Sequence, residues 1–256
     1  MNGIRLTFLG TGTSTGVPMI GCKCPVCRSS DPHDSRLRAS ALVETGGRRL
    51  LIDCGPDFRQ QILRLESPRL DALLVTHTHY DHLGGIDDLR PYCIREGGFP
   101  VYCRHDVSAD IHTRMPYCFG PQHYPGAPNY DIHIITDEPF LAAGIPVTPL
   151  PVMHTKTLRI TGFRIGALSY ITDCKTMPDR TLGLLKGTHT LVINALRFKE
   201  HPSHLNIAEA LDVIKAVKPR RALLTHISHD LGLHATVDRQ LPDGVQLAFD
   251  GLTIEI

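Results

Sequence analysis

The sequence predicts an α/β protein with sheets at the centre and helices outside. Two observations predict it. Short apolar runs of strand length recur along the 256-residue chain, and in its second half they alternate with helical patterns. This length allows one large domain or two small ones. Because the sequence contains no internal repeat and no Gly/Ser-rich linker, we expect a single domain over residues 1–256.

The strands are expected wherever apolar and β-branched residues form runs of strand length bounded by turn residues. Gly46-Gly47 separates two of these runs and predicts a tight hairpin turn. In chain order, the expected strands lie at 4–10, 39–46, 48–55, 71–77, 99–103, 145–152, 160–166, 167–173, 190–196, 221–227 and 245–256.

One helix is predicted by both periodicity and capping. Asn206 is a suitable N-cap, Glu209 follows three residues later, and the apolar residues after Asn206 recur at helical spacing. Shorter helices are expected within 57–66 and 178–187, the second with Pro178 near its first position. The proline-rich and aromatic segment 115–130 predicts a long irregular loop.

Composition bounds the possible partners. A formal charge of +1 does not favour duplex nucleic acid, whose binding proteins usually carry a basic face or a high pI. No apolar stretch reaches the length of a membrane span, and the apolar run at the N-terminus is too short for a signal peptide. We therefore expect a cytoplasmic protein with no membrane partner. In that compartment the eight cysteines are expected to be ligands or small core residues.

The segment "HTHYDH" (77–82) concentrates ligand-type residues directly after an apolar run. His77 and His79 can face the same way at the end of a strand, with Cα atoms about 6.5–7 Å apart. Asp81 and His82 cannot both continue that alternation, so the chain must turn after Tyr80. The alternative is two solvent-facing histidines and an aspartate that caps a helix. Four such residues in six favour a metal site instead.

Three further residues of ligand type follow apolar runs. His154, Asp173 and His226 each lie at or just beyond the C-terminal end of an expected strand. Strand ends meet at one edge of a sheet, where α/β proteins usually bind ligands. A hydrolytic site with two metal ions needs about six or seven protein ligands. These residues and the histidine cluster supply that number.

With these motifs in order, the chain resembles the metallo-β-lactamase superfamily over nearly its whole length, through "LIDCG", "HTHYDH", His154, "YITDC" and "LTHIS". The resemblance implies a four-layer αββα sandwich with two active-site metal ions. It assigns His77, His79 and His154 to one ion, and Asp81, His82 and His226 to the other. Asp173 bridges both, and Asp81 is also expected to take part in catalysis. Mixed His/Asp ligation suits zinc, manganese or iron.

The segment "GCKCPVC" (21–27) places three thiols within six residues. A redox pair is the alternative to a metal site, but thioredoxin-type motifs follow a strand and open a helix. The surrounding sequence is similar to the cyclic phosphodiesterases of the carbon–phosphorus lyase pathway (the PhnP family) and to coenzyme-PQQ biosynthesis protein B. That similarity implies a closed structural zinc site of Cys22, Cys24, Cys27 and His229, with the zinc loop over residues 11–30.

The same resemblance favours the phosphodiesterases through two further positions. Lys156 follows His154 by two residues and would bind substrate, unless it is a solvated loop lysine. His204 precedes a helix and would act as general acid, with His201 as its competitor. The implied reaction is hydrolysis of a small, cyclic phosphodiester such as phosphoribosyl 1,2-cyclic phosphate by a hydroxide that the two metal ions activate. A homodimer would match these relatives.

Three other functions remain open. A tRNA 3′-processing nuclease of the same superfamily would need a basic, glycine-rich arm, which the sequence lacks. A non-catalytic, zinc-stabilised protein like the PQQ protein is disfavoured by the full ligand set. The fold itself also permits thioester or lactam hydrolysis.

Overall fold

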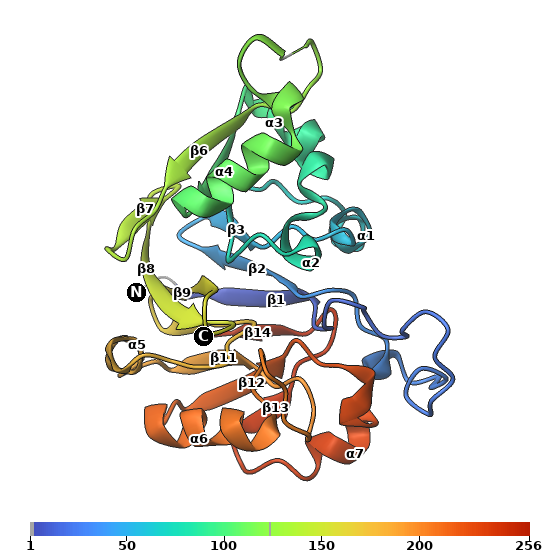
Figure 1. Cartoon of the computed structure of the whole chain (residues 1–256). Helices are drawn as coiled ribbons and strands as arrows, with labels where there is room; N and C mark the ends of the chain where they lie inside the picture. The colour runs from blue at the N-terminus through green and yellow to red at the C-terminus, as the bar shows by residue number, and fades with distance from the viewer. Residues whose placement is uncertain (1–2, 123) are drawn as a thin grey trace.

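The computed structural model describes residues 3–122 and 124–256. Two seven-stranded sheets stack face to face, with helices on the outer side of each. In Figure 1, α3 and α4 lie beyond one sheet and α6 and α7 beyond the other. This is the expected four-layer αββα sandwich.

The first sheet has the order β14-β1-β2-β3-β4-β5-β6. The strands from β3 to β6 run parallel, and those from β14 to β3 pair antiparallel. Their bounds are β14 (Thr253–Glu255), β1 (Arg5–Gly10), β2 (Ser40–Thr45), β3 (Arg48–Ile52), β4 (Ala72–Leu74), β5 (Phe99–Cys103) and β6 (Tyr130–Ile134). The Gly46-Gly47 turn between β2 and β3 is confirmed, with φ values of 56° and 74°.

The second sheet has the order β13-β12-β11-β10-β9-β8-β7. Strands β10 to β13 run parallel, and β7 to β10 pair antiparallel. Their bounds are β13 (Val245–Leu247), β12 (Arg221–Thr225), β11 (Thr190–Asn194), β10 (Leu168–Tyr170), β9 (Arg159–Ile165), β8 (Ile145–Met153) and β7 (Phe140–Ala142).

The prediction of one continuous strand over 245–256 was wrong. Val245–Leu247 joins the second sheet, whereas Thr253–Glu255 crosses to the first. The chain turns between them at Gly251, whose φ is 89°, and the Gly251 amide donates to the Phe8 carbonyl at 2.7 Å. The segment between β13 and β14 therefore crosses from the second sheet to the first. Strands β6 and β7 were not anticipated, because their exposed positions interrupt the apolar pattern.

The helices are short. Their bounds are α1 (Phe58–Leu63), α2 (Tyr80–Leu83), α3 (Arg90–Glu96), α4 (His105–Arg114), α5 (Asp179–Leu184), α6 (Ile207–Val217) and α7 (His234–Asp238). The capping box of Asn206 and Glu209 is confirmed at α6. Pro178 is the N-cap of α5 rather than a residue of its first turn. Helix α4 was missed because its sequence is largely polar. The described part of the expected loop 115–130 contains the single-turn 3-10 helices η3 (Pro116–Cys118) and η4 (Gly120–Gln122).

Three apolar clusters match the layers. The central cluster joins residues of both sheets, such as Phe8 and Leu50 of the first and Phe163 and Tyr170 of the second. The two outer clusters lie between each sheet and its helices. Burial of both faces explains why the central strands are continuous apolar runs.

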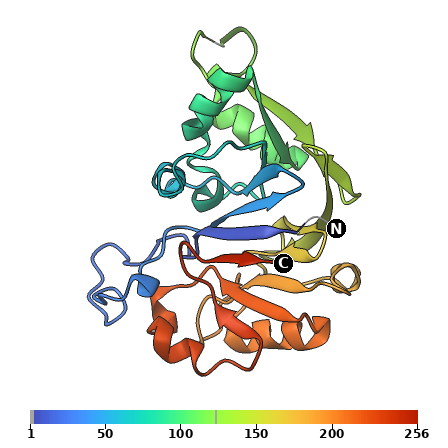
Figure 2. The ribbon, with the colours of Figure 1, turned by 180° about the vertical axis from the view of Figure 1, so that it is seen from behind.

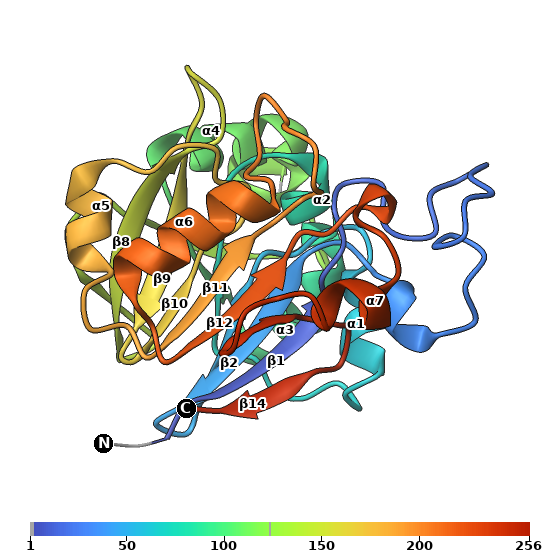
Figure 3. The ribbon, with the colours of Figure 1, turned by 90° about the horizontal axis from the view of Figure 1, so that it is seen from below.

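The segment between β1 and β2 leaves the sandwich as a long loop, which Figure 2 shows projecting beside α7. Gly12 pairs with both Arg38 and Ile227, so the base of the loop is attached near the end of β12. Figure 3 shows the same loop to the side of the strand ends. No helix among the described residues is long and apolar enough to cross a membrane.

Candidate metal centre

The seven predicted ligands converge at one edge of the sandwich. His154 and His226 directly follow β8 and β12, and Asp173 lies three residues beyond β10. The ligand atoms form two groups in which all atoms lie within 4.8 Å of one another. These groups are His77, His79 and His154, and then Asp81, His82, Asp173 and His226.

Helix α2 turns the second half of "HTHYDH" toward this edge. The helix begins at Tyr80 with His79 as its N-cap residue, so the alternative in which Asp81 caps a helix is wrong. The turn depends on close backbone contacts. A Cβ on Gly55 would lie 2.0 Å from the Asp81 carbonyl oxygen, and one on Gly85 would lie 1.9 Å from that of Gly55. Only glycine permits this approach.

Asp173 lies between the two groups. Its Oδ2 is 3.1 Å from His82 Nε2, and its Oδ1 is 3.1 Å from His226 Nε2. A further group of mutually close ligand atoms joins Asp173 to His154 and His204. Burial alone would raise the pKa of Asp173, but the facing imidazoles of His226 and His82 outweigh it and hold that pKa well below its usual value. The carboxylate is therefore ionised and reaches ligands of both groups.

Three residues at this edge adopt the left-handed backbone conformation. The φ values of Asp53, Asp173 and His226 are 62°, 52° and 56°. This conformation is unfavourable for residues other than glycine, by about 1–3 kcal/mol each in sparsely populated regions, and it clusters at functional sites. At each of these three residues, the left-handed conformation lets the backbone turn sharply away from the preceding strand.

Asp53 was not predicted as part of the site. It is fully buried, and its Oδ2 accepts a 2.7 Å hydrogen bond from His82 Nδ1. Its Oδ1 accepts from the Thr76 amide at 2.8 Å. With Nδ1 protonated, His82 presents Nε2 to Asp81 and Asp173, the orientation that a metal-binding histidine needs. The only sequence signal was its place in "LIDCG", at the end of a buried run.

The protonation pattern of the histidines fits a divalent cation. His154 Nδ1 donates to the carbonyl oxygens of Asp173 and Ser203, both at 2.8 Å, so its Nε2 carries the lone pair. The Nε2 atom of His77 is buried without a hydrogen-bond partner, and that of His82 makes no hydrogen bond although Asp81 Oδ2 and Asp173 Oδ2 both lie 3.1 Å from it. Buried polar atoms are rarely left so, and a bound metal ion would satisfy them. Burial, followed by the charge of His82, lowers the pKa of His77 well below its usual value, which favours the neutral, metal-binding form.

Comparison with known proteins agrees with this geometry. Residues 48–227 match the model of the beta-lactamase superfamily domain. The crystal structure of a protein described as a new diphosphatase from the PhnP family is 40% identical, with a TM-score of 0.91 over 99% of this chain and 98% of that one. The chain belongs to the beta-lactamase superfamily, and within it to the PhnP family. It has the metallo-β-lactamase fold, and this fold implies divalent metal binding.

Other relatives differ in name and in length. A Porphyromonas gingivalis protein named octanoyltransferase is 44% identical over 97% of this chain, but the chain spans only 51% of that protein. Coenzyme PQQ synthesis protein B of Pseudomonas putida is 22% identical over 98% of this chain and 99% of its own length. The short form of human tRNase Z has a TM-score of 0.72 at 19% identity, over 98% of each chain, and shares the fold.

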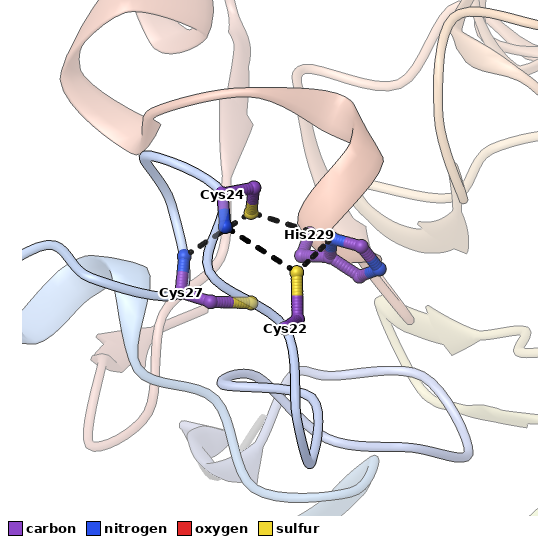
Figure 4. A group of neighbouring side chains, drawn as sticks. All are labelled: Cys22, Cys24, Cys27 and His229. Atoms are coloured by element: carbon purple, nitrogen blue, oxygen red, sulfur yellow. Dashed lines mark hydrogen bonds between the residues drawn. The ribbon is translucent and has the colours of Figure 1, made fainter.

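A separate group of ligand-type residues joins the projecting loop of this PhnP-family protein to the segment after β12. Cys22, Cys24, Cys27 and His229 have ligand atoms within 4.8 Å of one another. Figure 4 shows the Cys22 and Cys24 sulfurs beside the His229 ring, at 3.6 and 3.4 Å from Nδ1. The backbone amide of Cys27 donates to Cys24 Sγ and lowers the pKa of that thiol to about 6. Three thiols and one imidazole fit a closed tetrahedral zinc site.

The remaining cysteines are free thiols that belong to none of these ligand groups. Cys54, Cys93, Cys103, Cys118 and Cys174 are all buried. Burial raises the pKa of Cys103 and of Cys174 to about 12. These residues fit the expectation of small core side chains.

His204 and His201 occupy different places. His204 Nε2 is 3.0 Å from Asp173 Oδ1, whereas His201 lies behind it, with 3.1 Å between the two Nδ1 atoms. Lys156 is exposed in the turn after His154 and makes no ion pair with the described residues. Of the two histidines, His204 is the one that reaches the candidate centre.

Proposed function

We propose that this protein hydrolyses a small phosphodiester. The observation that carries the proposal is the position of the Asp173 carboxylate, whose oxygens lie near ligands of both groups. In this account His77, His79 and His154 would hold one divalent ion, and Asp81, His82 and His226 the other, with Asp173 bridging. Such ions lower the pKa of a bound water toward about 7 and neutralise phosphoryl oxygens.

The chain's own residues would supply orientation and a proton. His204 would protonate the leaving oxygen, since an alkoxide leaves poorly without a proton. Its Nε2 is 3.0 Å from Asp173 Oδ1, and 12% of its side chain is exposed to solvent. Lys156 would bind a phosphate oxygen as a point charge. Asp53 would keep His82 oriented throughout.

The substrate that we favour is a cyclic phosphodiester such as phosphoribosyl 1,2-cyclic phosphate, on the strength of the PhnP-family relationship. A second candidate is a diphosphate bond, because the relative with the TM-score of 0.91 is described as a diphosphatase. Both reactions need attack at a phosphorus atom beside neutralised oxygens. They differ in whether the leaving oxygen belongs to an alcohol or to another phosphate.

Two rival functions are less well supported. A tRNA-processing nuclease must bind a polyanion, whereas the formal charge here is only +1. A non-catalytic zinc protein would not need the complete ligand set. The buried Nε2 atom of His77, which has no hydrogen-bond partner, would also be costly there.

A substrate screen tests the proposal. The protein, loaded with zinc or with manganese, would be assayed against ribose cyclic phosphates, cyclic nucleotides, bis-p-nitrophenyl phosphate, dinucleoside diphosphates and precursor tRNA. We expect turnover of a small phosphodiester to exceed that of the other classes. Turnover of precursor tRNA alone would favour the nuclease, and no turnover with full metal content would contradict the proposal.

A further inference from the structure

A carboxylate and a hydroxyl lie buried behind the candidate metal centre. Asp53 directly follows β3, Thr76 lies two residues beyond β4, and both residues are fully buried. Asp53 accepts three hydrogen bonds. Its Oδ1 accepts from the Thr76 amide at 2.8 Å, and its Oδ2 accepts from His82 Nδ1 at 2.7 Å and from the Thr76 hydroxyl at 2.9 Å. One carboxylate oxygen therefore serves both a ligand-type histidine and a threonine.

The Thr76 hydroxyl also contacts the next residue, His77. The distance from Thr76 Oγ1 to His77 Nδ1 is 2.9 Å. A hydroxyl has one proton to donate and two lone pairs that accept. Because its proton goes to Asp53, the hydroxyl oxygen accepts from His77, and the His77 proton is on Nδ1. The lone pair of His77 then lies on Nε2, the buried atom that has no hydrogen-bond partner.

The backbone around this pair is fixed from both sheets. Ser40 Oγ on β2 donates to the Asp53 carbonyl at 2.9 Å, and the Asp53 amide donates to the Leu74 carbonyl at 3.0 Å. The Thr76 carbonyl accepts from the Thr161 amide on β9, in the second sheet, at 3.1 Å. A β-branched side chain has few rotamers. Because the backbone is held as well, the Thr76 hydroxyl keeps its direction.

We propose that Asp53 positions one histidine in each metal-binding group, His82 directly and His77 through the Thr76 hydroxyl. His77 belongs to the first group and His82 to the second. Outer partners of this kind fix the tautomer and ring orientation of a metal-binding histidine, and they raise its basicity. Asp53 and Thr76 are thus positioning residues, and the carboxylate supports both ions. The inference rests on the metal binding that the fold implies and not on which bond the protein hydrolyses.

Thr225 provides a matched comparison within the chain. It directly precedes His226 at the end of β12, as Thr76 directly precedes His77, and it is also fully buried. Its hydroxyl has no hydrogen-bond partner among the described residues. A buried threonine before a ligand-type histidine is therefore not sufficient for positioning. What distinguishes Thr76 is the carboxylate behind its hydroxyl.

Competition with a chelator, applied to the metal-loaded protein, measures how tightly the two active-site ions are held. Thr76→Val removes the hydroxyl with little change in volume. It should weaken one ion by about 10–100-fold and the other by much less. Thr76→Ser and the control Thr225→Val should hold both ions as the unmodified protein does. If valine is not accommodated at position 76, Thr76→Ala gives the same test.

Asp53→Asn should weaken both ions. Because it also removes a negative charge, the Thr76 variants separate positioning from charge. The double variant Asp53→Asn/Thr76→Val should weaken the ion of the His77 group no further than Asp53→Asn does, since both changes break the same path. Additive losses at that ion would contradict a path from Asp53 through Thr76.

Nuclear magnetic resonance of the same loaded proteins identifies the histidine concerned. Buried, hydrogen-bonded N–H protons exchange slowly with water, so the Nδ1 protons of His77 and His82 should both be visible. Thr76→Val should speed exchange at His77 alone, and Asp53→Asn should speed it at both rings. Unchanged metal affinity and unchanged exchange in Thr76→Val overturn the proposal, and so does an equal loss in Thr225→Val. If the expected pattern appears in a protein that hydrolyses no phosphodiester, the proposed function fails and the positioning role stands.

Discussion

The side-chain amide of Asn194 holds the residue after Asp173 at both backbone atoms. Asn194 Oδ1 accepts from the Cys174 amide at 2.8 Å, and Asn194 Nδ2 donates to the Cys174 carbonyl at 3.0 Å. Asn194 is fully buried at the end of β11, which pairs in parallel with β10. Because Asp173 itself is in the left-handed conformation, this neighbouring strand fixes the direction of its carboxylate.

Asn194→Leu should therefore weaken metal binding at a distance. The substitution leaves the Cys174 amide buried without its partner, although the Cys174 carbonyl keeps the Leu205 amide at 2.8 Å, and Asp173 can relax from its unfavourable conformation. Loss of an outer-shell partner typically costs about 10–100-fold in metal affinity. Metal affinity would be measured by competition with a chelator. The control Thr190→Val changes a buried residue at the other end of β11; if both variants bind metal as the unmodified protein does, Asn194 has no positioning role.

Asp173→Ala should lower the metal content of the candidate centre and nearly abolish the proposed hydrolysis, because the carboxylate approaches ligands of both groups. The fold should survive, since the strands on either side remain paired. Metal content by elemental analysis and circular dichroism would be recorded together. Full activity with two active-site ions would remove Asp173 from the centre.

Much of this site could be predicted from the sequence, because its ligands form a dense motif or follow apolar runs. His77, His82 and His226 were identifiable in this way. Asp53 and Asn194 were not, because each acts through a side-chain contact with a residue distant in the sequence. The fold was predictable where strands are buried on both faces. The fold was not predictable at β6, at α4 or where the C-terminal segment crosses from one sheet to the other.

His204→Ala separates proton donation from metal binding. If His204 protonates the leaving group, the variant should keep both active-site ions and lose more rate on alkyl phosphodiesters than on p-nitrophenyl esters. Nitrophenolate leaves without much protonation, so its loss should be smaller. Loss of an ion would instead make His204 a ligand, consistent with its 3.0 Å approach to Asp173, and equal losses on both esters would argue against a general acid.

Cys24→Ser should release one zinc per chain and lower the melting temperature. Structural zinc binding in small peptides is worth about 10–16 kcal/mol at neutral pH, and His229 joins the projecting loop to the segment after His226. Cobalt substituted at this site should give intense thiolate charge-transfer bands, which the variant weakens. If the unmodified protein with its full metal content shows no such band, the three cysteines are not a metal site.

Asp250 should make the stability of the protein depend on pH. Its carboxylate accepts hydrogen bonds from the amides of Thr11 and Leu37, and burial raises its pKa from 3.8 to about 6. Because the folded pKa exceeds the unfolded one, its contribution is largest below pH 4 and is lost as pH rises through 6, by about 3 kcal/mol at most. The free energy of unfolding in urea would be compared with that of Asp250→Asn from pH 4 to 7.5. As pH rises from 4 to 7.5, the unmodified protein should lose free energy of unfolding relative to Asp250→Asn. A difference between the two proteins that does not change with pH would contradict the raised pKa.

The most direct test of the central claim, a dinuclear phosphodiesterase, is to return metal to metal-free protein while phosphodiester hydrolysis is followed. With the cysteine site already filled by zinc, we predict that activity appears with the added active-site ions and saturates at two per chain. Asp173→Ala should not saturate in this way. A protein with two active-site ions bound that hydrolyses neither phosphodiesters nor diphosphates would contradict the account.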